Sequence, residues 1–272
     1  MTMRGADETV LPNHEASLPN HDTSPRLMTR PEISVVIPCK NEAENLPELI
    51  GEIAEALSGR AFELIVVDDG STDATPDVIR ALMRDRPWLR SMRDTRSSGQ
   101  SAAVRTGLLA ARGDIVLTID GDGQNNPEFM PAMLDALEQG GPRTALVAGQ
   151  RLKRTDSGAK RIASRLANRL RGAILKDGTR DSGCGLKAVR REVFLLFPYF
   201  DGWHRYLPAL TIREGYKVAH VDVVDRNRRH GTSKYGILDR ALVGALDLFG
   251  VWWLIRRRKN IPAPIEVKVD GR

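Results

Sequence analysis

The amino-acid sequence predicts an α/β fold with a mostly parallel sheet that is flanked by helices. The first observation is that short apolar runs alternate with segments of helical periodicity from residue 32 onward. Such alternation is typical of βαβ units, and strands covered on both faces read as continuous apolar runs. The second observation is that Asp68, Asp120 and Asp122 directly follow such runs. Open α/β sheets bind ligands at the carboxyl ends of their strands, so these side chains mark the expected site.

The first half of the chain alternates predicted strands with predicted helices. The strands are short apolar runs at residues 33–37, 62–67, 115–119 and 145–148. The helices lie at residues 45–57, 75–83, 101–111 and 127–138. In the first helix Leu46, Leu49 and Ile53 recur at helical spacing, and in the second Pro76 stands in the first turn, where proline is tolerated. This repetition of strand and helix predicts parallel pairing.

The second half is less regular and gives fewer elements. We expect a basic helix at residues 161–175, an apolar stretch at 190–200 and a strand at 217–224. Residues 1–31 are rich in Pro, Asn, His, Thr and Ser without periodicity, which is typical of a disordered tail. The expected organisation is a tail at residues 1–31, one domain at 32–236 and a C-terminal segment at 237–272.

The C-terminal segment is predicted to form an amphipathic helix over residues 237–259. Leu246, Phe249 and Trp253 share a broad apolar arc, and Asp247 and Arg257 fall on the opposite side. Two tryptophans followed by Arg-Arg-Arg-Lys indicate a helix at a membrane interface. The alternative is a helix packed on the domain with a solvated basic end. No apolar run reaches the roughly 20 residues that a membrane-spanning helix needs.

Composition narrows the class of partner. The chain has 272 residues, 41% of them hydrophobic, which is enough for one large core. Lys and Arg total 41 against 35 Asp and Glu, and the net charge of +6 suits an anionic partner such as a nucleotide, a lipid phosphate or a membrane surface. Uniform solvation of the charges is the alternative. Cys39 and Cys184 form no disulfide framework, which favours a reducing compartment.

Asp120 and Asp122 form the first candidate site, in the run Asp-Gly-Asp-Gly-Gln that follows a predicted strand. Their spacing directs both side chains the same way if the strand continues, so they can share one cation. Mg²⁺ or Mn²⁺ prefers such oxygen ligands, with water and substrate phosphate completing the shell. An EF-hand loop is rejected, because Asn125 and Pro131 stand where that loop needs glycine and glutamate. Two solvated turn carboxylates are the alternative.

Asp68 and Asp69 form the second candidate site, at the end of the strand predicted for residues 62–67. Asp68 could accept hydrogen bonds from a base or a ribose, and a capping aspartate in a turn is the alternative. Acidic clusters at two strand ends of one sheet favour a nucleotide site. Other signatures are missing from the sequence: no Gly-x-Gly-x-x-Gly follows the first strand, and neither a P-loop nor a Gly-x-Ser-x-Gly elbow is present.

The motifs of residues 32–151, taken together, resemble those of the family 2 glycosyltransferases with the GT-A fold. They are Val36-Ile37-Pro38 with Asn41-Glu42, residues 66–73, Ser98-Gly99-Gln100 with Ala102-Ala103, and residues 120–124 with Pro127-Glu128. Residues 181–185, 204–210 and 226–236 further resemble the polyprenyl-phosphate sugar transferases, the dolichol-phosphate mannose synthase group, with a likeness to dodecaprenyl-phosphate galacturonate synthases. The Gln-x-x-Arg-Trp motif of processive synthases is missing, which implies transfer of one sugar per turnover.

The resemblance implies an inverting transfer of a sugar from a nucleoside-diphosphate sugar, UDP by preference, to polyprenyl phosphate at the cytoplasmic face of the plasma membrane. It implies Mg²⁺ or Mn²⁺ held by Asp120, Asp122 and Gln124. The implied donor-binding residues are Pro38, Asn41, Glu42, Asp68, Asp69, Gly99, Asp120 and Arg151. The implied acceptor-phosphate residues are Arg205, Arg226, Arg228, Ser233 and Lys234. The implied catalytic residues are Asp122, Asp181, Arg205, Arg228 and Lys234.

Alternatives remain for these residues and for the function. Each basic residue could be a solvated surface charge, and Asp181 could belong to a structural turn. A sugar nucleotidyltransferase would have a glycine-rich basic loop after the first strand, where this chain has Pro38-Cys39-Lys40-Asn41. A noncatalytic nucleotide-sugar or nucleic-acid binder would not need paired carboxylates, and the aromatic residues are not interleaved with the basic ones. The expected partners are the membrane surface and a small membrane protein, without nucleic acid.

Overall fold

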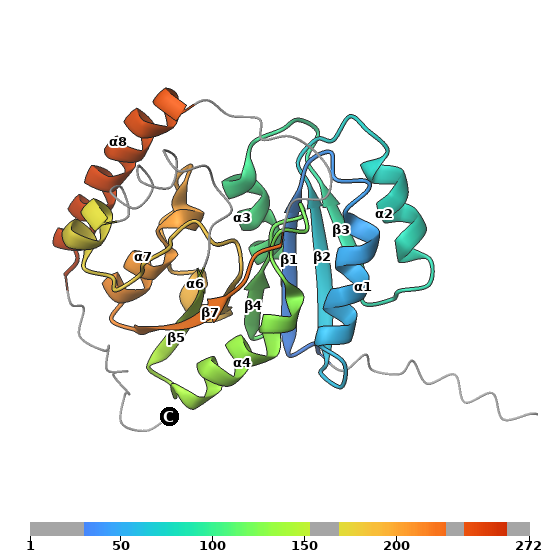
Figure 1. Cartoon of the computed structure of the whole chain (residues 1–272), viewed down its shortest axis with the longest axis horizontal. Coiled ribbons are helices and arrows are strands. Elements are labelled where there is room, and N and C mark those ends of the chain that lie inside the picture. Colours follow the sequence, from blue (N-terminus) through green and yellow to red (C-terminus); the bar gives the residue numbers. More distant parts are fainter. Residues whose placement is uncertain (1–29, 153–168, 227–236, 260–272) are drawn as a thin grey trace, which may run out of the picture.

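A computed structural model describes residues 30–152, 169–226 and 237–259 of the chain. One seven-stranded sheet runs through the described part in the order β3-β2-β1-β4-β6-β5-β7 (Figure 1). Its strands are β1 (Ile33–Cys39), β2 (Phe62–Asp68), β3 (Leu89–Arg93), β4 (Ile115–Thr118), β5 (Thr144–Arg151), β6 (Lys187–Arg190) and β7 (Lys217–Val223). All neighbours pair in parallel except those of β6, which is antiparallel to β4 and to β5.

Helices cover both faces of this sheet, as the alternating sequence predicts. They are α1 (Leu46–Ala56), α2 (Thr75–Met83), α3 (Gln100–Ala110), α4 (Met130–Gln139), α6 (Arg191–Phe194), α7 (Leu207–Arg213) and α8 (Ile237–Arg256), with the short 3-10 helices η1 (Pro127–Phe129) and η2 (Trp203–Arg205). Residues 169–175 are also helical, and they are the described part of the basic helix expected at 161–175. The expected disordered tail lies almost wholly outside the described residues.

Two hydrophobic layers explain why the central strands are almost wholly apolar; their buried polar residues Ser34 and Glu63 are hydrogen-bonded to each other. Helices α1, α2 and α4 bury their apolar side chains on one face, and α3, α6, α7 and α8 cover the other (Figure 1). Within β1, Val35 and Ile37 face the first layer and Val36 faces the second. Successive side chains of a strand point to opposite faces, so a strand covered on both sides has apolar residues at most positions.

Three elements lie where no regular element is predicted. Strand β3 is at the edge of the sheet and buries only Leu89 of its five residues, so its sequence has no apolar run. Strand β6 is four residues long and precedes the expected apolar stretch, whose start forms α6. Helix α7 buries Leu207 and Leu210 against the second layer. These elements are defined by long-range packing and have no local periodic signal of sufficient length.

The C-terminal helix α8 is confirmed and packs on the domain. Leu248, Val251 and Trp252 join the second hydrophobic layer, and Tyr206 Oη donates to the carbonyl of Gly244. Apolar side chains therefore lie on the packed side of the helix as well as on its outer side, where Phe249 is exposed. Among the described residues, no helix is both long enough and apolar enough to span a membrane.

The carboxyl ends of the central strands meet at one edge of the sheet. Cys39 ends β1 opposite Asp68 at the end of β2, and the amide of Asp69 donates to the carbonyl of Cys39. On the other side of β1, the loop after β4 returns so closely that the amide of Gly121 donates to the carbonyl of Pro38 at 3.3 Å. Parallel pairing thus brings the two acidic motifs of the sequence to the same edge.

Candidate functional site

The loop that follows strand β4, residues 119–126, contains Asp120 and Asp122. We call it the metal loop, after the metal site predicted there. Asp120 Oδ1 accepts a hydrogen bond of 2.7 Å from Gln100 Nε2, at the first residue of α3. Asp122 Oδ1 accepts the amide of Gln124 at 3.2 Å, which bends the loop back on itself. Gly185 lies against the Asp120 carboxyl group so closely that a Cβ there would be 2.4 Å from its Cγ. Only glycine at this position leaves room for the carboxylate.

Burial raises the pKa of Asp120 to about 6, and the negative charge of Asp122 adds to this effect. The positive charges of Lys187 and Arg151 act in the opposite direction. An effect of Asp122 on Asp120 means that the two carboxylates are close enough to repel each other. Such a pair gains most from a cation placed between them or beside them.

The donor set fits Mg²⁺ or Mn²⁺ that is also bound to substrate. Two carboxylates on one loop offer hard oxygen ligands, and the missing side chain of Gly185 is what lets the Asp120 carboxylate take its position. No cluster of three or more His, Cys, Asp or Glu side chains suited to a metal occurs in the described ranges. Mg²⁺ in proteins is usually bound by one or two carboxylates, with water and phosphate as its other ligands. The side chain of Gln124 stays a predicted ligand.

Asp68 lies at the end of β2, where a contact with the nucleotide is predicted. Its Oδ1 accepts the amide of Ser71 at 2.8 Å. Its Oδ2 lies 3.3 Å from Arg93 Nε, yet this buried oxygen has no hydrogen-bond partner within the described part of the chain. A buried carboxylate oxygen without a donor is costly, so its position is consistent with a ligand that supplies one.

Asp69 has a different environment, because its carboxylate is bound by the loop before α3. It accepts hydrogen bonds from Ser97 Oγ at 2.7 Å and from the amides of Ser98 and Gly99 at 2.6 and 3.0 Å. Gly99 has a φ of 91°, a left-handed conformation that favours glycine. Asp69 therefore holds the loop that carries Gln100 to Asp120.

Asn41 and Glu42 join the loops that follow β1 and β2. The amide of Asn41 donates to Ser71 Oγ at 2.8 Å, and Asn41 Oδ1 accepts the amide of Thr72 at 2.8 Å. The amide of Glu42 donates to Thr75 Oγ1 at 2.9 Å. These bonds fix the rim around the predicted donor site, and Pro38 lies buried in β1 just below it. The contacts of these residues with a nucleotide stay predictions.

Arg151 lies between two buried carboxylates at the end of β5. Its Nε and Nη2 bind Asp181 at 2.5 and 2.9 Å, and its Nη1 binds Asp225 Oδ2 at 3.2 Å. The hydrogen bond to Asp181 raises the pKa of Arg151 against the effect of burial, so the guanidinium stays charged. Within the described residues, carboxylates accept hydrogen bonds from three of its five N–H groups, and its contact with a donor phosphate stays a prediction.

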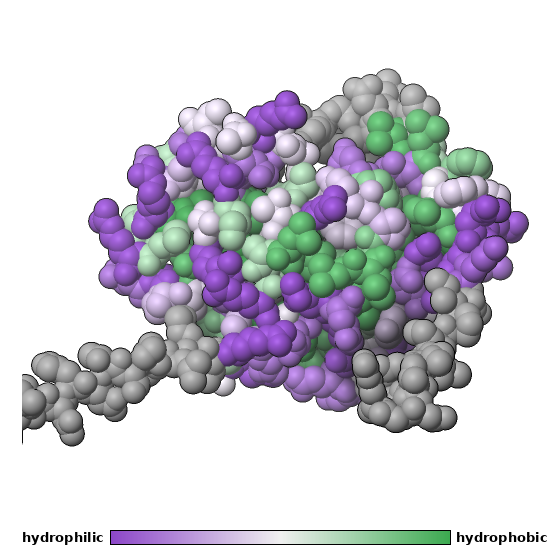
Figure 2. Space-filling model, turned by 180° about the vertical axis from the view of Figure 1, so that it is seen from behind, coloured by the Kyte–Doolittle hydropathy of each residue, from purple (hydrophilic) through white to green (hydrophobic). Residues whose placement is uncertain are grey.

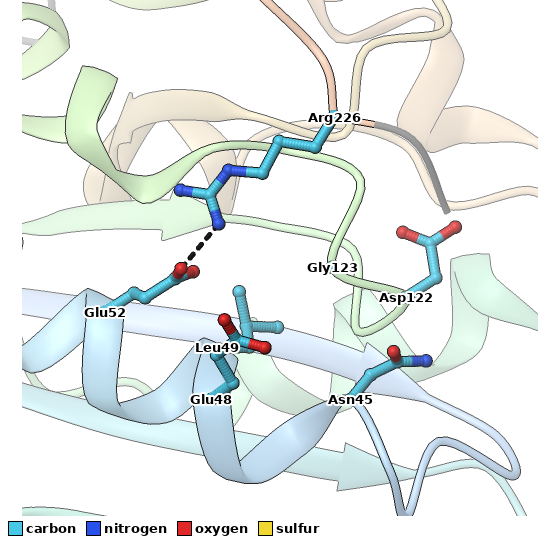
Figure 3. Close-up of a pocket in the computed structure, with 7 residues that line it drawn as sticks. All are labelled: Asn45, Glu48, Leu49, Glu52, Asp122, Gly123 and Arg226. Atoms are coloured by element: carbon cyan, nitrogen blue, oxygen red, sulfur yellow. Dashed lines mark hydrogen bonds and ion pairs between the residues drawn. The ribbon is translucent and has the colours of Figure 1, made fainter. Parts of the chain in front are cut away.

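The predicted acceptor residues lie only partly within the described ranges. Arg205 is exposed on η2. Arg226 extends from the end of β7 to α1, where its Nη1 binds Glu52 Oε1 at 2.5 Å (Figure 3). Arg228, Ser233 and Lys234 lie outside the described residues.

Figure 3 shows a small pocket beside Asp122, between the metal loop and the helix α1. It is lined by Asn45, Glu48, Leu49, Glu52, Asp122, Gly123 and Arg226. Its volume of about 10 Å³ is that of roughly one water molecule, so it does not hold a sugar nucleotide. It marks where α1 meets the metal loop.

Sequence reasoning missed several residues that the fold brings to this site. Gln100 binds Asp120, and Asp225 binds Arg151 and Asn125. Lys187 is only 3% exposed and donates to the carbonyl of Cys184, while burial lowers its pKa. Two of these residues could have been recognised from the sequence, because Gln100 belongs to the motif Ser98-Gly99-Gln100 and Lys187 is a charged residue inside the apolar run 186–189. No sequence pattern indicates the role of Asp225.

His204 and Ser101 form a further pair beneath the site. Ser101 Oγ and His204 Nδ1 are 2.7 Å apart, and the amide of Gly202 donates to Ser101 Oγ at 2.8 Å. Burial lowers the pKa of His204 to about 3, and the nearby charges of Arg205 and Lys187 add to this shift. The imidazole is therefore neutral at physiological pH and ties η2 to α3.

The backbone resembles solved structures of mycobacterial proteins. One crystal structure of glucosyl-3-phosphoglycerate synthase from Mycobacterium tuberculosis, in complex with Mn²⁺ and UDP-glucose, has a TM-score of 0.61 and 25% identity, over 81% of this chain and 79% of that one. A second crystal structure, of a mycobacterial protein, has a TM-score of 0.63 and 26% identity over 81% of this chain and 75% of that one. The predicted GT-A fold is confirmed.

Sequence relatives include transferases that use polyprenyl phosphates. The chain is 36% identical over 231 residues to dodecaprenyl-phosphate galacturonate synthase of Rhizobium johnstonii, covering 83% of this chain and 68% of that protein. It is 34% identical over 209 residues to undecaprenyl-phosphate 4-deoxy-4-formamido-L-arabinose transferase of Edwardsiella ictaluri, covering 76% of this chain and 63% of that protein. The chain thus spans about two thirds of the length of these relatives, and the resemblance to the polyprenyl-phosphate group is confirmed.

The family itself follows from a match over most of the described domain. The model of the family described as Glycosyl transferase family 2 matches residues 34–196, which hold β1 to β6 with the metal loop and the Asp68 rim. The match covers more than half of the 272 residues. The chain therefore belongs to glycosyl transferase family 2.

Proposed function

We propose that the chain transfers one sugar from a nucleoside-diphosphate sugar, UDP-linked by preference, to polyprenyl phosphate, with inversion at the anomeric carbon. The single observation that supports it most is the carboxylate pair Asp120 and Asp122 at the carboxyl edge of the sheet, with the Asp120 carboxylate packed against Gly185. The named relatives act on polyprenyl phosphates, which supports the acceptor class. The complex of the structural relative with UDP-glucose supports the donor class.

The residues of the rim have distinct parts in this reaction. Asp120 and Asp122 would hold Mg²⁺ or Mn²⁺, which when bound would supply positive charge near the departing diphosphate, and Gln100 fixes the orientation of Asp120. Asp68 accepts hydrogen bonds from the nucleoside through Oδ2, which is ion-paired with Arg93 and has no hydrogen-bond donor among the described residues. Arg151 directs its remaining N–H groups to the donor phosphates, while Asp181 holds its guanidinium in place.

The acceptor phosphate is already an anion at neutral pH, so it needs no strong general base. Its attack on the anomeric carbon depends on positioning and on neutralising charge between two phosphate groups. Arg205 is exposed at the rim and can bind phosphate through its planar fork. Arg228, Ser233 and Lys234 are proposed as further acceptor ligands from the family resemblance alone. Arg226 is bound to Glu52, so it acts here through the loop it holds.

The outer side of α8 is proposed to lie on the cytoplasmic surface of the plasma membrane. Leu246, Phe249 and Trp253 are 65, 64 and 50% exposed, and basic residues follow from Arg256 onward. Figure 2, which shows the molecule from behind, has apolar side chains on the side where α8 lies. Aromatic rings followed by basic side chains suit the interface with anionic lipid. The alternative partner for this surface of α8 is a small membrane protein.

A transfer assay tests the proposed reaction. Purified protein is incubated with Mn²⁺, radiolabelled UDP-sugars in turn and polyprenyl phosphate in detergent, and the label in the organic phase is identified by mass spectrometry. We expect labelled polyprenyl-phosphate sugar from the wild type and a loss of at least about 10²-fold in Asp122→Ala. Asp135→Ala, which removes an exposed carboxylate on α4, is the matched control. Release of pyrophosphate in place of UDP, or full activity of Asp122→Ala, would refute the proposal.

Vesicle flotation tests the membrane surface. We expect the wild type to float with vesicles of phosphatidylglycerol and phosphatidylethanolamine, and Leu246→Ser/Phe249→Ser/Trp253→Ser to stay at the bottom, because three exposed apolar side chains are lost. Leu109→Ser, on α3, removes an apolar side chain that is equally exposed and serves as the control. Equal flotation of all three proteins would exclude this surface.

A further inference from the structure

The metal loop is hydrogen-bonded to two residues that follow strand β7. Asp225 Oδ1 accepts a hydrogen bond of 3.0 Å from Asn125 Nδ2. The amide of Arg226 donates to the carbonyl of Gln124 at 2.8 Å, and Arg226 Nη2 donates to Asn126 Oδ1. Three consecutive residues of the loop are therefore each bound by this dipeptide, which we name the strap (Asp225–Arg226).

The strap is itself fixed at both ends by charged groups of the domain. Asp225 Oδ2 accepts from Arg151 Nη1 at 3.2 Å, and its side chain is only 9% exposed. Arg226 is paired with Glu52 on α1, as Figure 3 shows. The loop is thus bound to β5 on one side and to α1 on the other.

The loop depends on these bonds for its shape. Within it, Asp122 Oδ1 accepts the amide of Gln124 at 3.2 Å, and the contacts of Gln124, Asn125 and Asn126 with the strap join the loop to the rest of the domain. Asn125 is buried, and its Nδ2 is satisfied chiefly by Asp225 because the contact with Cys184 Sγ is 4.0 Å long. Removing the Asp225 carboxylate would leave a buried amide donor and one N–H group of Arg151 without a partner.

We propose that Asp225 is a positioning residue for the metal loop, and that the strap sets the geometry in which Asp122 can bind a divalent cation. This rests on the proposed function for the identity of the cation and the substrate. Asp225 does not touch the reacting atoms. It acts through Asn125 and Arg151, both of which border the site. Outer partners of this kind commonly change metal affinity by about 10–100-fold.

Two measurements on the full chain test the strap. Hydrogen exchange reports whether the loop loosens, and titration of Mn²⁺ in the presence of UDP, followed by electron paramagnetic resonance, reports metal affinity. In Asp225→Ala we expect amide exchange at residues 122–126 to accelerate at least about tenfold and the Mn²⁺ Kd to rise about tenfold. Asp225→Asn keeps an acceptor for Asn125 and should give a smaller change, about threefold, with the fold intact.

Asp222→Ala is the matched control, because Asp222 is also on the β7 segment but pairs with the exposed Arg180. It should leave both measurements unchanged. Wild-type exchange and Mn²⁺ affinity in Asp225→Ala, or an equal effect of Asp222→Ala, would overturn the proposal. Failure of the wild type to transfer sugar, with the exchange result as expected, would instead count against the proposed function and leave the strap in place.

Discussion

Replacing Gly185 by alanine places a methyl group in the space of the Asp120 carboxylate. The new Cβ would lie 2.4 Å from Cγ and Oδ2 and 2.6 Å from Oδ1 of Asp120. Ordinary contacts between such atoms are about 3.5 Å, so the carboxylate must move by about 1 Å. It would then lose its 2.7 Å hydrogen bond from Gln100 and the orientation in which it is proposed to bind the cation.

A displacement of about 1 Å at a reacting site can lower the rate by about 10²-fold. We therefore expect Gly185→Ala to reduce sugar transfer about 10²-fold and to raise the Mn²⁺ Kd. The displaced atoms belong to the end of a side chain rather than to the backbone, so the free energy of unfolding should fall by only about 1–3 kcal/mol. Transfer assays, Mn²⁺ titration and urea unfolding measure the three effects on the same protein.

Alanine substitutions at two other glycines serve as comparisons for Gly185→Ala. A Cβ at Gly183 would lie 3.2 Å from Arg151 Nη2, which needs a shift of only a few tenths of an ångström, so Gly183→Ala should lose much less activity. Gly51, within α1, has no atom within 4 Å of an added Cβ. Gly51→Ala should keep full activity and gain about 0.5–1 kcal/mol of stability. Activity of Gly185→Ala within twofold of the wild type would refute the reasoning about Asp120.

Three further outcomes are expected. The pKa of His204 is lowered from 6.5 to about 3, so between these pH values the unfolded protein binds a proton at His204 that the folded protein does not. The free energy of unfolding of the wild type should therefore fall as the pH drops from 6.5 to 3, by at most about 4–5 kcal/mol. Urea unfolding of His204→Gln should not show this part of the pH dependence. Asp177→Ala leaves the buried Arg171 without its carboxylate and should lose about 3–5 kcal/mol, whereas Asp77→Ala, which breaks an exposed pair with Arg80, should change stability by less than about 1 kcal/mol. Chelation with EDTA should abolish transfer reversibly without lowering the thermal midpoint by more than a few degrees, and activity that persists in EDTA would contradict the metal's role.

The sequence was sufficient where the determinants are local. The runs at 33–37 and 62–67 became β1 and β2 because all their positions except Ser34 and Glu63 are apolar. Helix α1 follows the spacing of Leu46, Leu49 and Ile53 almost residue for residue. The acidic residues that follow predicted strands could be identified for the same reason, because the apolar run and the carboxylate after it are neighbours in the sequence.

The sequence was insufficient where a role depends on a partner far along the chain. A contact of Asp69 with the nucleotide stays a prediction, and the structure adds that residues 97–99 donate hydrogen bonds to its carboxylate, a contact that no local pattern reports. The C-terminal helix was read as having one apolar arc. In the structure its packed side is formed by Leu248, Val251 and Trp252, a division that depends on where the domain lies.

By itself the sequence determined the alternation of strands and helices, the two covered faces of the sheet and the placing of Asp120 and Asp122 at its carboxyl edge, because strand and helix periodicity are properties of neighbouring residues. Only the tertiary structure decided that β6 enters the sheet antiparallel, that Gln100 and Gly185 shape the space of Asp120, and that Asp225 joins Arg151 to the metal loop. These contacts link residues from different parts of the chain, and they exist only once the sheet has brought its strand ends together.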